Sequence, residues 1–277
     1  MAARQACGGA LGGAGWVGSR AMAAKLYVVH GSHPCATVEK ALELKGIPYK
    51  KVELPPPSQA LVMPRIFGGR TVPGIRFEDG EKIQGSRAIL RALEARVPEP
   101  ALYGAEGVEE AERWGDEVLQ SVARRLLWPT FQRSPRSMHA YQEGQRGPKL
   151  PMAVIVASAP LITRIERRMN DATDAAARAD LRTLPGHLDR IDGWIAAGVL
   201  GGERPNAADL QIAPTLRLLH SIGDVRPLVA GRPAEELAFR WFERLPGETP
   251  AGVLPAEWLS EHRAPAAASP AGPAGPS

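Results

Sequence analysis

The sequence predicts a small α/β domain with a mixed four-stranded sheet, followed by a larger all-α helical-bundle domain. Short β-rich runs alternate with helical runs over residues 25–97, whereas apolar residues recur at helical spacing from Val108 onward. A segment rich in proline and glycine, VPEPALYGA, separates the two patterns. At 277 residues, the chain is long for one compact domain and of ordinary length for two.

The first half begins with a strand, a helix and a second strand. KLYVV, at 25–29, is a short β-rich run and is expected to be a buried strand. TVEKALELKG places its apolar residues on one helical face, and Gly46 ends that helix. YKKVEL, at 49–54, alternates as a strand does. PPPSQ then breaks the chain, and a short helix near Leu61 is expected.

A hairpin and a helix complete this domain. GIRF and KIQ flank EDGE, and the Asp79–Gly80 pair is a strong hairpin signal. SRAILRALEAR then begins at Ser86 with the spacing of an amphipathic helix. This order of elements predicts a small α/β unit with a mixed sheet.

The second half carries only helical signals. The expected helices follow Val108, a proline-rich interruption is expected at 129–135, and Pro185 is expected to split a later helix near its start. In RPNAADLQ, Asn206 is predicted to cap a helix whose third residue, Asp209, suits the helix dipole.

Composition excludes several classes of protein. The formal net charge is +4, but basic and acidic residues are interleaved and the longest basic runs are pairs, so no nucleic-acid partner is expected. No segment approaches the roughly 18 consecutive apolar residues of a spanning helix, so no membrane partner is expected either. The two cysteines, Cys7 and Cys35, form no disulfide framework, which suits a cytoplasmic location.

The two ends differ from the rest in composition. Residues 1–24 hold no acidic side chain and no hydrophobic period, which predicts a flexible leader, with Met22 as an alternative start. The tail at 263–277 is made almost entirely of alanine, glycine, proline and serine and is expected to be disordered. The predicted domains are therefore 25–97 and 106–262, joined by a linker at 98–105.

The first domain resembles a known family. A strand, a loop ending at Ser32 or Cys35, a helix closing on KGIPY, the sequence TVP before a hairpin, and a Ser-x-x-Ile helix are similar to the thioredoxin-like N-terminal domain of the glutathione S-transferase superfamily. The all-helical remainder extends the likeness, and Asn206 with Asp209 resembles the capping motif of the second transferase domain. The resemblance implies a cis bond between Val72 and Pro73.

The resemblance places Ser32 where relatives carry the catalytic serine or the first cysteine. Ser32-His33-Pro34-Cys35 then resembles a thioredoxin-type C-x-P-C motif whose first cysteine is serine. A thiol bound at a helix N-terminus meets free N–H groups and a partial positive charge, and both favour the thiolate. A serine hydroxyl adds one hydrogen bond to the charged sulfur. The thiol co-substrate supplies the nucleophile.

Other roles for these residues are open. Ser32 can simply cap its helix, as serines commonly do. Cys35 is the alternative catalytic residue, but it occupies the second position of the motif and lacks a cysteine partner. His30, His33 and Cys35 match no zinc spacing, so no metal is expected. His33 is expected to face out of the first helical turn and to line the substrate cleft.

The resemblance also implies the rest of a thiol site. The backbone of Val72, beside Pro73, would pair with the cysteinyl part of glutathione, and Ser86 at a helix start would hold the γ-glutamyl carboxylate. Relatives usually carry an acidic residue before that serine, whereas this chain has Gly85. Gln84 is expected to compensate in part and Arg87 to contribute. The missing acid also leaves room for a low-molecular-weight thiol other than glutathione.

The expected function is that of a glutathione-transferase-like enzyme with no tightly bound cofactor. It would use glutathione or another thiol as co-substrate and attack a small-molecule electrophile. A homodimer is expected because dimers are common in the superfamily. The alternatives are a non-catalytic binding module with this fold and a thiol-disulfide reductase or isomerase centred on Cys35.

Overall fold

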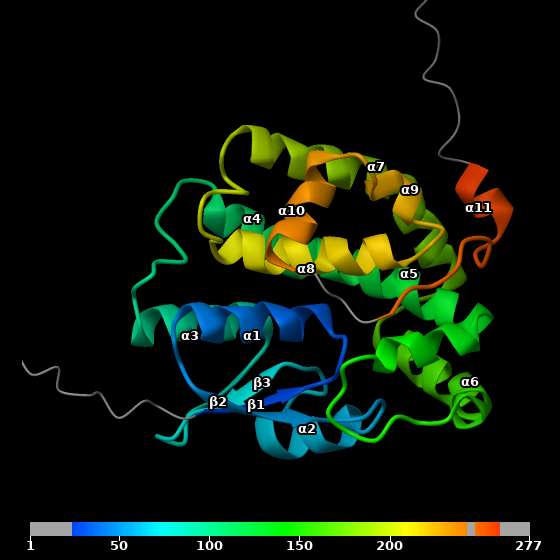
Figure 1. Cartoon of the computed structure of the whole chain (residues 1–277), viewed down its shortest axis with the longest axis horizontal. Coiled ribbons are helices and arrows are strands. Elements are labelled where there is room, and N and C mark those ends of the chain that lie inside the picture. The colour runs from blue at the N-terminus through cyan, green and yellow to red at the C-terminus, as the bar shows by residue number, and fades with distance from the viewer. Residues whose placement is uncertain (1–23, 243–246, 261–277) are drawn as a thin grey trace, which may run out of the picture.

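The computed structural model describes residues 24–242 and 247–260. The tail predicted at 263–277, and all but the last residue of the leader predicted at 1–24, lie outside the described residues. Two layers of secondary structure carry the described chain: an N-terminal α/β layer and a helical layer above it (Figure 1).

The N-terminal domain contains one sheet and three helices. Its elements are β1 (Ala24–Val28), α1 (His33–Leu44), β2 (Tyr49–Glu53), α2 (Gln59–Phe67), β3 (Gly74–Arg76), β4 (Lys82–Gln84) and α3 (Ser86–Arg96). The strand order is β2-β1-β3-β4, with β1 parallel to β2 and antiparallel to β3, and with β3 antiparallel to β4. The predicted mixed four-stranded sheet is confirmed.

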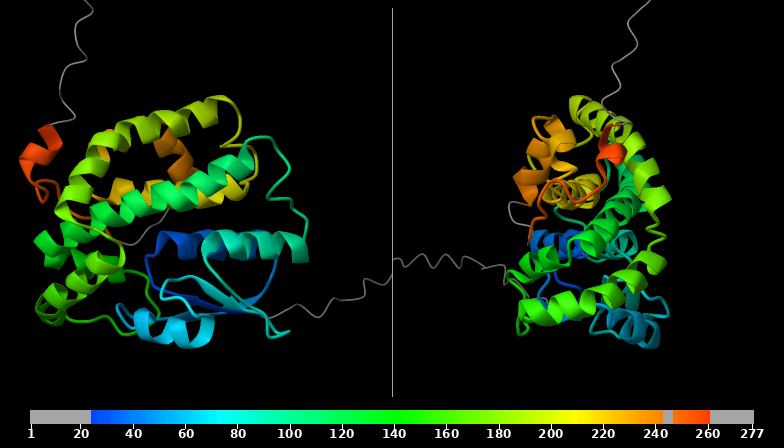
Figure 2. Two further views of the ribbon diagram at one scale, coloured as in Figure 1. Left: turned by 180° about the vertical axis from the view of Figure 1, so that it is seen from behind. Right: turned by 90° about the vertical axis from the view of Figure 1, so that its right-hand side faces the viewer.

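The sheet separates α2 from the other two helices. Helices α1 and α3 lie between the sheet and the helical domain, and α2 covers the opposite face (Figures 1 and 2). α2 packs so closely on β3 that a Cβ at Gly74 would lie 2.7 Å from Met63 Cε and from the Phe67 ring. Glycine is therefore required at position 74, because no side chain fits between α2 and the sheet.

The helical domain follows a coil segment that begins after α3. Its elements are α4 (Val108–Trp114), the π-helical turn η1 (Gly115–Leu119), α5 (Gln120–Arg133), the 3₁₀ segment η2 (Pro135–Gln142), α6 (Met152–Met169), α7 (Asp174–Ala196), α8 (Ala207–Ser221), α9 (Arg226–Val229), α10 (Pro233–Trp241) and α11 (Ala256–Ser260). The predicted all-helical character of this half is confirmed.

Proline interrupts these helices less than the sequence predicted. Pro129 lies inside α5, which continues to Arg133, and Pro185 lies inside α7 without splitting it. The interruption predicted at 129–135 falls at Ser134, between α5 and η2, whereas the split predicted at Pro185 was wrong. The buried apolar face of each helix continues through its proline, so packing outweighs the loss of one backbone hydrogen bond.

Helix α8 is the centre of the second domain. Nearly all of its residues are buried, and it packs against α1 of the first domain as well as α4, α5 and α10. The predicted cap is confirmed: Asn206 Oδ1 accepts from the Asp209 backbone N–H at 3.0 Å, and Asp209 Oδ2 accepts from the Asn206 N–H at 3.0 Å. This reciprocal capping box fixes where α8 begins.

A buried lysine holds the segment between the domains. Lys45 Nζ donates to Glu94 Oε2 at 2.5 Å and to the carbonyls of Pro98 and Pro100 at 3.0 and 2.7 Å. Glu94 in turn accepts from the Leu102 N–H. The chain between α3 and α4 is thus tied to the first domain, which limits how the domains can shift. Within the described residues, no helix has the length and apolar character needed to cross a membrane.

Candidate functional site

A cleft of about 960 Å³ lies between the two domains. One wall comes from the first domain: the loop after β1, the start of α1, the loop before β3 and the start of α3. The other wall comes from η1, α5, η2 and α6 of the helical domain. Ligand sites in proteins commonly lie at domain interfaces in clefts of this size.

Ser32 stands at the start of α1, on the wall of this cleft. It is the residue before the first helical residue, yet its hydroxyl accepts no hydrogen bond from a helix N–H. The hydroxyl instead interacts with the thiol of Cys35. Pro34 occupies the first turn, where its missing N–H leaves no helical bond unmade. Ser32 is thus at the cap position without performing a side-chain cap.

Cys35 lies behind Ser32 and away from the cleft. It is 2% exposed and does not line the cleft. Burial raises the pKa of its thiol to about 12, although hydrogen bonds from Ser32 and the Val29 backbone act in the opposite direction. The thiol therefore stays protonated at neutral pH, and a protonated thiol is a poor nucleophile.

His33 lines the cleft, but it does so as a buried side chain. The expectation that it faces out of the first turn was wrong, since only 3% of the residue is exposed. Its Nε2 is buried and makes no hydrogen bond with a described residue. Burial, and secondarily the charge of Arg124, hold the pKa of His33 well below its usual range. The imidazole is therefore neutral at physiological pH.

Val72 and Gln84 belong to the same corner of the first domain. Val72 lines the cleft, and the peptide bond between it and Pro73 is cis. Gln84 does not line the cleft; its Oε1 accepts from the Gly69 N–H at 3.0 Å and its Nε2 donates to the Thr71 carbonyl at 2.6 Å. Gln84 therefore holds the loop that leads to Val72, and it acts behind the cleft wall.

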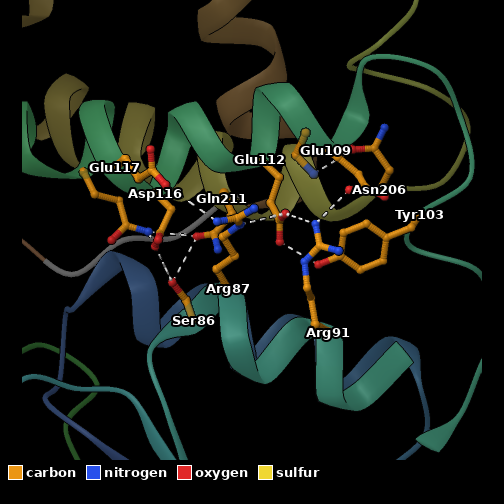
Figure 3. Close-up of polar contacts among 12 residues, drawn as sticks. Ser86, Arg87, Arg91, Tyr103, Glu109, Glu112, Asp116, Glu117, Asn206 and Gln211 are labelled. Atoms are coloured by element: carbon orange, nitrogen blue, oxygen red, sulfur yellow. Dashed lines mark hydrogen bonds and ion pairs between the residues drawn. The ribbon is translucent and has the colours of Figure 1, made fainter. Parts of the chain in front are cut away.

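Ser86 lies at the first position of α3 and joins the two domains through hydrogen bonds (Figure 3). Its hydroxyl lies 3.3 Å from Asp116 Oδ1 and 3.1 Å from Gln211 Oε1. Gln120 Nε2 donates to the same Gln211 oxygen at 2.8 Å. Gly85, the residue before Ser86, has a φ angle of +93°, a conformation that residues with a side chain rarely adopt. The backbone thus disfavours any side chain, acidic or not, at position 85.

Arg87 faces another part of the interface. It does not line the cleft, and its guanidinium pairs with Glu112 at 3.2 Å and with Glu117 at 3.6 Å (Figure 3). Glu112 is fully buried. Its carboxylate also forms an ion pair with Arg91 at 3.2 Å and accepts a hydrogen bond from the hydroxyl of Tyr103. Arg87 therefore belongs to an ion-pair network that fastens α3 to α4.

The comparisons with known proteins agree with this architecture. Residues 26–101 match the family model of the glutathione S-transferase N-terminal domain. The N-terminal domain belongs to the glutathione S-transferase superfamily. The resemblance found in the sequence is thereby confirmed for this domain. No curated protein matches the sequence.

Solved structures share the fold of most of the chain. A glutathione S-transferase from Methylobacterium radiotolerans, in complex with glutathione sulfonate, is 18% identical with a TM-score of 0.55, and the match covers 82% of this chain and 96% of that one. Glutathione transferase F2 from Populus trichocarpa is 16% identical with a TM-score of 0.53, and the match covers 78% of this chain and 91% of that one. The β-etherase LigF from Sphingobium sp. strain SYK-6 is 15% identical with a TM-score of 0.52, and the match covers 78% of this chain and 98% of that one. At these identities, the likeness concerns the fold alone.

Asp116 is a cleft residue that sequence reasoning missed. It lies in η1, lines the cleft beside Ser86, and forms no ion pair with a described residue. Burial raises the pKa of its carboxyl, although Ser86, Arg87 and Arg124 act in the opposite direction. π-Helical turns are rare and often occur at functional sites, but no local pattern predicts this one. The sequence feature that could have indicated Asp116 is the spacing of Asp116, Gln120 and Arg124 at intervals of four residues.

Part of the helical wall of the cleft is apolar, although Arg125, Ser158 and Glu166 line that wall too. Leu127, Trp128 and Phe131 of α5 line it together with Met138 and Ile155. These side chains are positioned by helices that are expected from their apolar spacing, but the surface they form depends on how the helices pack. The cleft thus has a polar end at α1 and α3, and the apolar cluster on α5, η2 and α6 is called its apolar end below.

No metal centre is apparent in the part of the chain that the structure describes. Among residues 24–242 and 247–260, no three histidine, cysteine, aspartate or glutamate side chains cluster so that they could hold a metal ion.

Proposed function

We propose that this protein binds glutathione, or another low-molecular-weight thiol, and activates its thiolate for attack on a small electrophile. The observation that carries the proposal is the position of Ser32 at the α1 N-terminus on the cleft wall, with a hydroxyl that caps no helix N–H. A sulfur placed against this hydroxyl lies at the positive end of a 12-residue helix. Both interactions favour the thiolate and lower the pKa of the bound thiol.

Cys35 is the weaker candidate for the reacting group. A thiol-disulfide mechanism needs an accessible thiolate, whereas Cys35 is buried and its pKa is raised to about 12. The nucleophilic sulfur belongs to the bound thiol.

The polar end of the cleft suits the amino-acid end of glutathione. Ser86 and the N-terminus of α3 offer hydrogen-bond donors to the γ-glutamyl carboxylate. Asp116, which lies 3.3 Å from the Ser86 hydroxyl and lacks a cationic partner among described residues, can receive the α-ammonium group. We therefore propose that Asp116 forms the ion pair for which relatives use an acidic residue at the position of Gly85. We also propose that the backbone of Val72 pairs with the cysteinyl part.

The electrophile would occupy the apolar end of the cleft. Trp128, Phe131 and Ile155 give this region an aromatic and aliphatic lining that suits a small apolar molecule. A thiolate held at Ser32 would attack an electrophilic carbon from the polar side. The new C–S bond forms as the leaving group departs, and the thiol proton passes to solvent.

Retention on immobilised glutathione and turnover with 1-chloro-2,4-dinitrobenzene test this function. The expected result is retention of the wild-type protein, release of chloride, and a kcat/KM that falls about 10- to 100-fold in Ser32→Ala, because one hydrogen bond to the thiolate is lost. Cys35→Ser is the matched variant and should stay within about threefold of the wild type. Loss in Cys35→Ser alone would favour the thiol-disulfide alternative, and neither retention nor turnover would favour a binding module.

The identity of the thiol, the location and the assembly belong to the same proposal. Mass spectrometry of the small thiols that copurify with the protein distinguishes glutathione from a substitute. The scarcity of cysteine supports a cytoplasmic location. The superfamily likeness supports a homodimer, and light scattering of the purified protein measures its mass in solution.

A further inference from the structure

Arg124 of α5 lines the cleft and has no carboxylate partner among the described residues. Its guanidinium donates only to neutral oxygens, Gln120 Oε1 at 3.3 Å and Ser121 Oγ at 3.4 Å, and it forms no ion pair with a described residue. The neighbouring Arg125 differs, because it makes two short bonds, 2.6 and 2.8 Å, to the Asp180 carboxylate. Arg124 thus keeps most of its donors free toward the cleft.

The surroundings of Arg124 are costly for an unpaired charge. Burial lowers the pKa of its guanidinium, and the more distant Asp116 offsets this only in part. A partly desolvated guanidinium with free donors is suited to bind a carboxylate through two parallel hydrogen bonds. The cleft therefore contains a cation whose missing partner is an anion.

His33 adds a second unused polar group to the cleft that Arg124 lines. The two side chains line the same cleft, and the charge of Arg124 contributes to lowering the pKa of His33. Its buried Nε2 has no hydrogen-bond partner among the described residues. The neutral imidazole can carry its proton on Nε2 and donate it. A buried polar atom left without a partner is unfavourable, so a ligand acceptor here would be stabilising.

The position of Arg124 along α5 indicates which ligand it serves. Asp116, Gln120 and Arg124 follow one another at intervals of four and all line the cleft. The Gln120 side chain donates to Ser86 Oγ at 3.3 Å and accepts from Arg124 at 3.3 Å, so Arg124 is the next polar group of this series after those that line the amino-acid end. The next cleft residues along the helix are Leu127 and Trp128, which begin the apolar end.

We propose that Arg124 and His33 bind a carboxylate of the electrophile, so that the substrate class is an apolar or aromatic electrophile that bears a carboxylate. This inference rests on the proposed function, since that function is what makes the occupant of the apolar end an electrophile. Arg124 binds substrate in this proposal and takes no part in bond formation.

A pair of aryl chlorides tests the proposal. 4-Chloro-3-nitrobenzoate carries the carboxylate, and 4-chloro-3-nitrobenzamide is its neutral match. Arg124→Gln is expected to lower kcat/KM for the benzoate about 10- to 100-fold and to leave that for the benzamide within about twofold. Arg124→Lys keeps the charge without the planar fork and should recover part of the loss. Arg164→Gln, at an exposed position of α6 outside the cleft, removes the same charge and should change neither.

Several outcomes overturn the proposal. Equal losses for both chlorides, or a raised KM for the thiol with either of them, would mean that Arg124 serves the thiol. An unchanged kcat/KM for the benzoate in Arg124→Gln would mean that Arg124 binds no carboxylate. If neither chloride reacts, the proposed function fails, and calorimetry without thiol then decides the inference: 3-nitrobenzoate must bind more tightly than 3-nitrobenzamide, and Arg124→Gln must abolish the difference. Equal binding of the two compounds contradicts it.

Discussion

The hydroxyl of Thr37 in α1 donates a 2.7 Å hydrogen bond to the backbone carbonyl of Leu210 in α8. Four residues after Leu210, the helix has Pro214, which carries no N–H. Thr37 therefore supplies, from the other domain, the donor that the helix itself cannot provide. Both partners are fully buried, so this bond joins the two domains where an unpaired carbonyl would be costly.

Removing the Thr37 hydroxyl should destabilise the protein. We expect Thr37→Val to lower the free energy of unfolding by about 1–3 kcal/mol, because the Leu210 carbonyl loses its donor. In a Pro214→Ala background, the helix regains an N–H at position 214, and the same change should cost less. Denaturant unfolding of the four proteins in this cycle measures the difference.

Thr130→Val is the matched control for this cycle. Thr130 is also fully buried, but its hydroxyl bonds to the Leu126 carbonyl at 2.8 Å within α5, where a helical N–H is available as well. Its substitution should cost less than that of Thr37. Equal costs, or no effect of the Pro214→Ala background, would contradict the role assigned to Thr37.

Asp116→Asn should weaken binding of the amino-acid end of glutathione. We expect the Kd of S-methylglutathione to rise about 10-fold, because the carboxylate proposed as the partner of the α-ammonium is lost. An analogue without the α-amino group should bind both proteins equally. Glu117→Gln alters the next residue, which pairs with Arg87 outside the cleft, and should leave both affinities unchanged.

The same ion pair predicts a dependence on pH. Burial raises the pKa of Asp116, so its carboxyl takes up a proton at a higher pH than an ordinary aspartate does. Only the ionised carboxylate attracts the ammonium group, so the Kd of S-methylglutathione should rise as the pH falls through this raised pKa. Calorimetric titrations of wild type and Asp116→Asn over a pH series test this. A rise of equal size in both proteins would assign the effect to another group.

Cys35 should resist alkylation while the protein is folded. Its pKa is raised from 9.0 to about 12, so at pH 9 the native protein has far less thiolate than the unfolded chain. We expect iodoacetamide to modify Cys35 at least about 100-fold more slowly in the native protein than in guanidinium chloride. Mass spectrometry of the peptide that contains Cys35 gives both rates. Rapid native modification would restore Cys35 as a candidate nucleophile.

The cap of α8 should contribute to stability and not to chemistry. Asn206→Ala is expected to lower the free energy of unfolding by about 1–2 kcal/mol, because the first turn loses its side-chain acceptor. Asn206→Ser keeps an acceptor but loses the donor that Asn206 offers the Val199 carbonyl. Its decrease in the free energy of unfolding should therefore be smaller than that of Asn206→Ala. Thermal unfolding measures both. A fall in kcat/KM at full stability would contradict a purely structural role.

Local sequence determined the elements of the first domain and the cap of α8. The hairpin at Asp79 and Gly80, the helix from Ser86 and the Asn206 cap all depend on residues within a few positions of one another, and the structure places them as predicted. Short-range conformational preference is sufficient there, because the residues that decide each feature are neighbours in the chain.

The tertiary structure alone decided the second wall of the candidate site. Asp116 in η1 and Arg124 in α5 lie about 30 residues or more along the chain from Ser86 and His33, and the fold brings all four to one cleft. His33 is buried although it stands in the first turn of its helix, and α5 and α7 continue through their prolines because their apolar faces are packed. Such features depend on contacts between distant segments, so no local pattern can predict them.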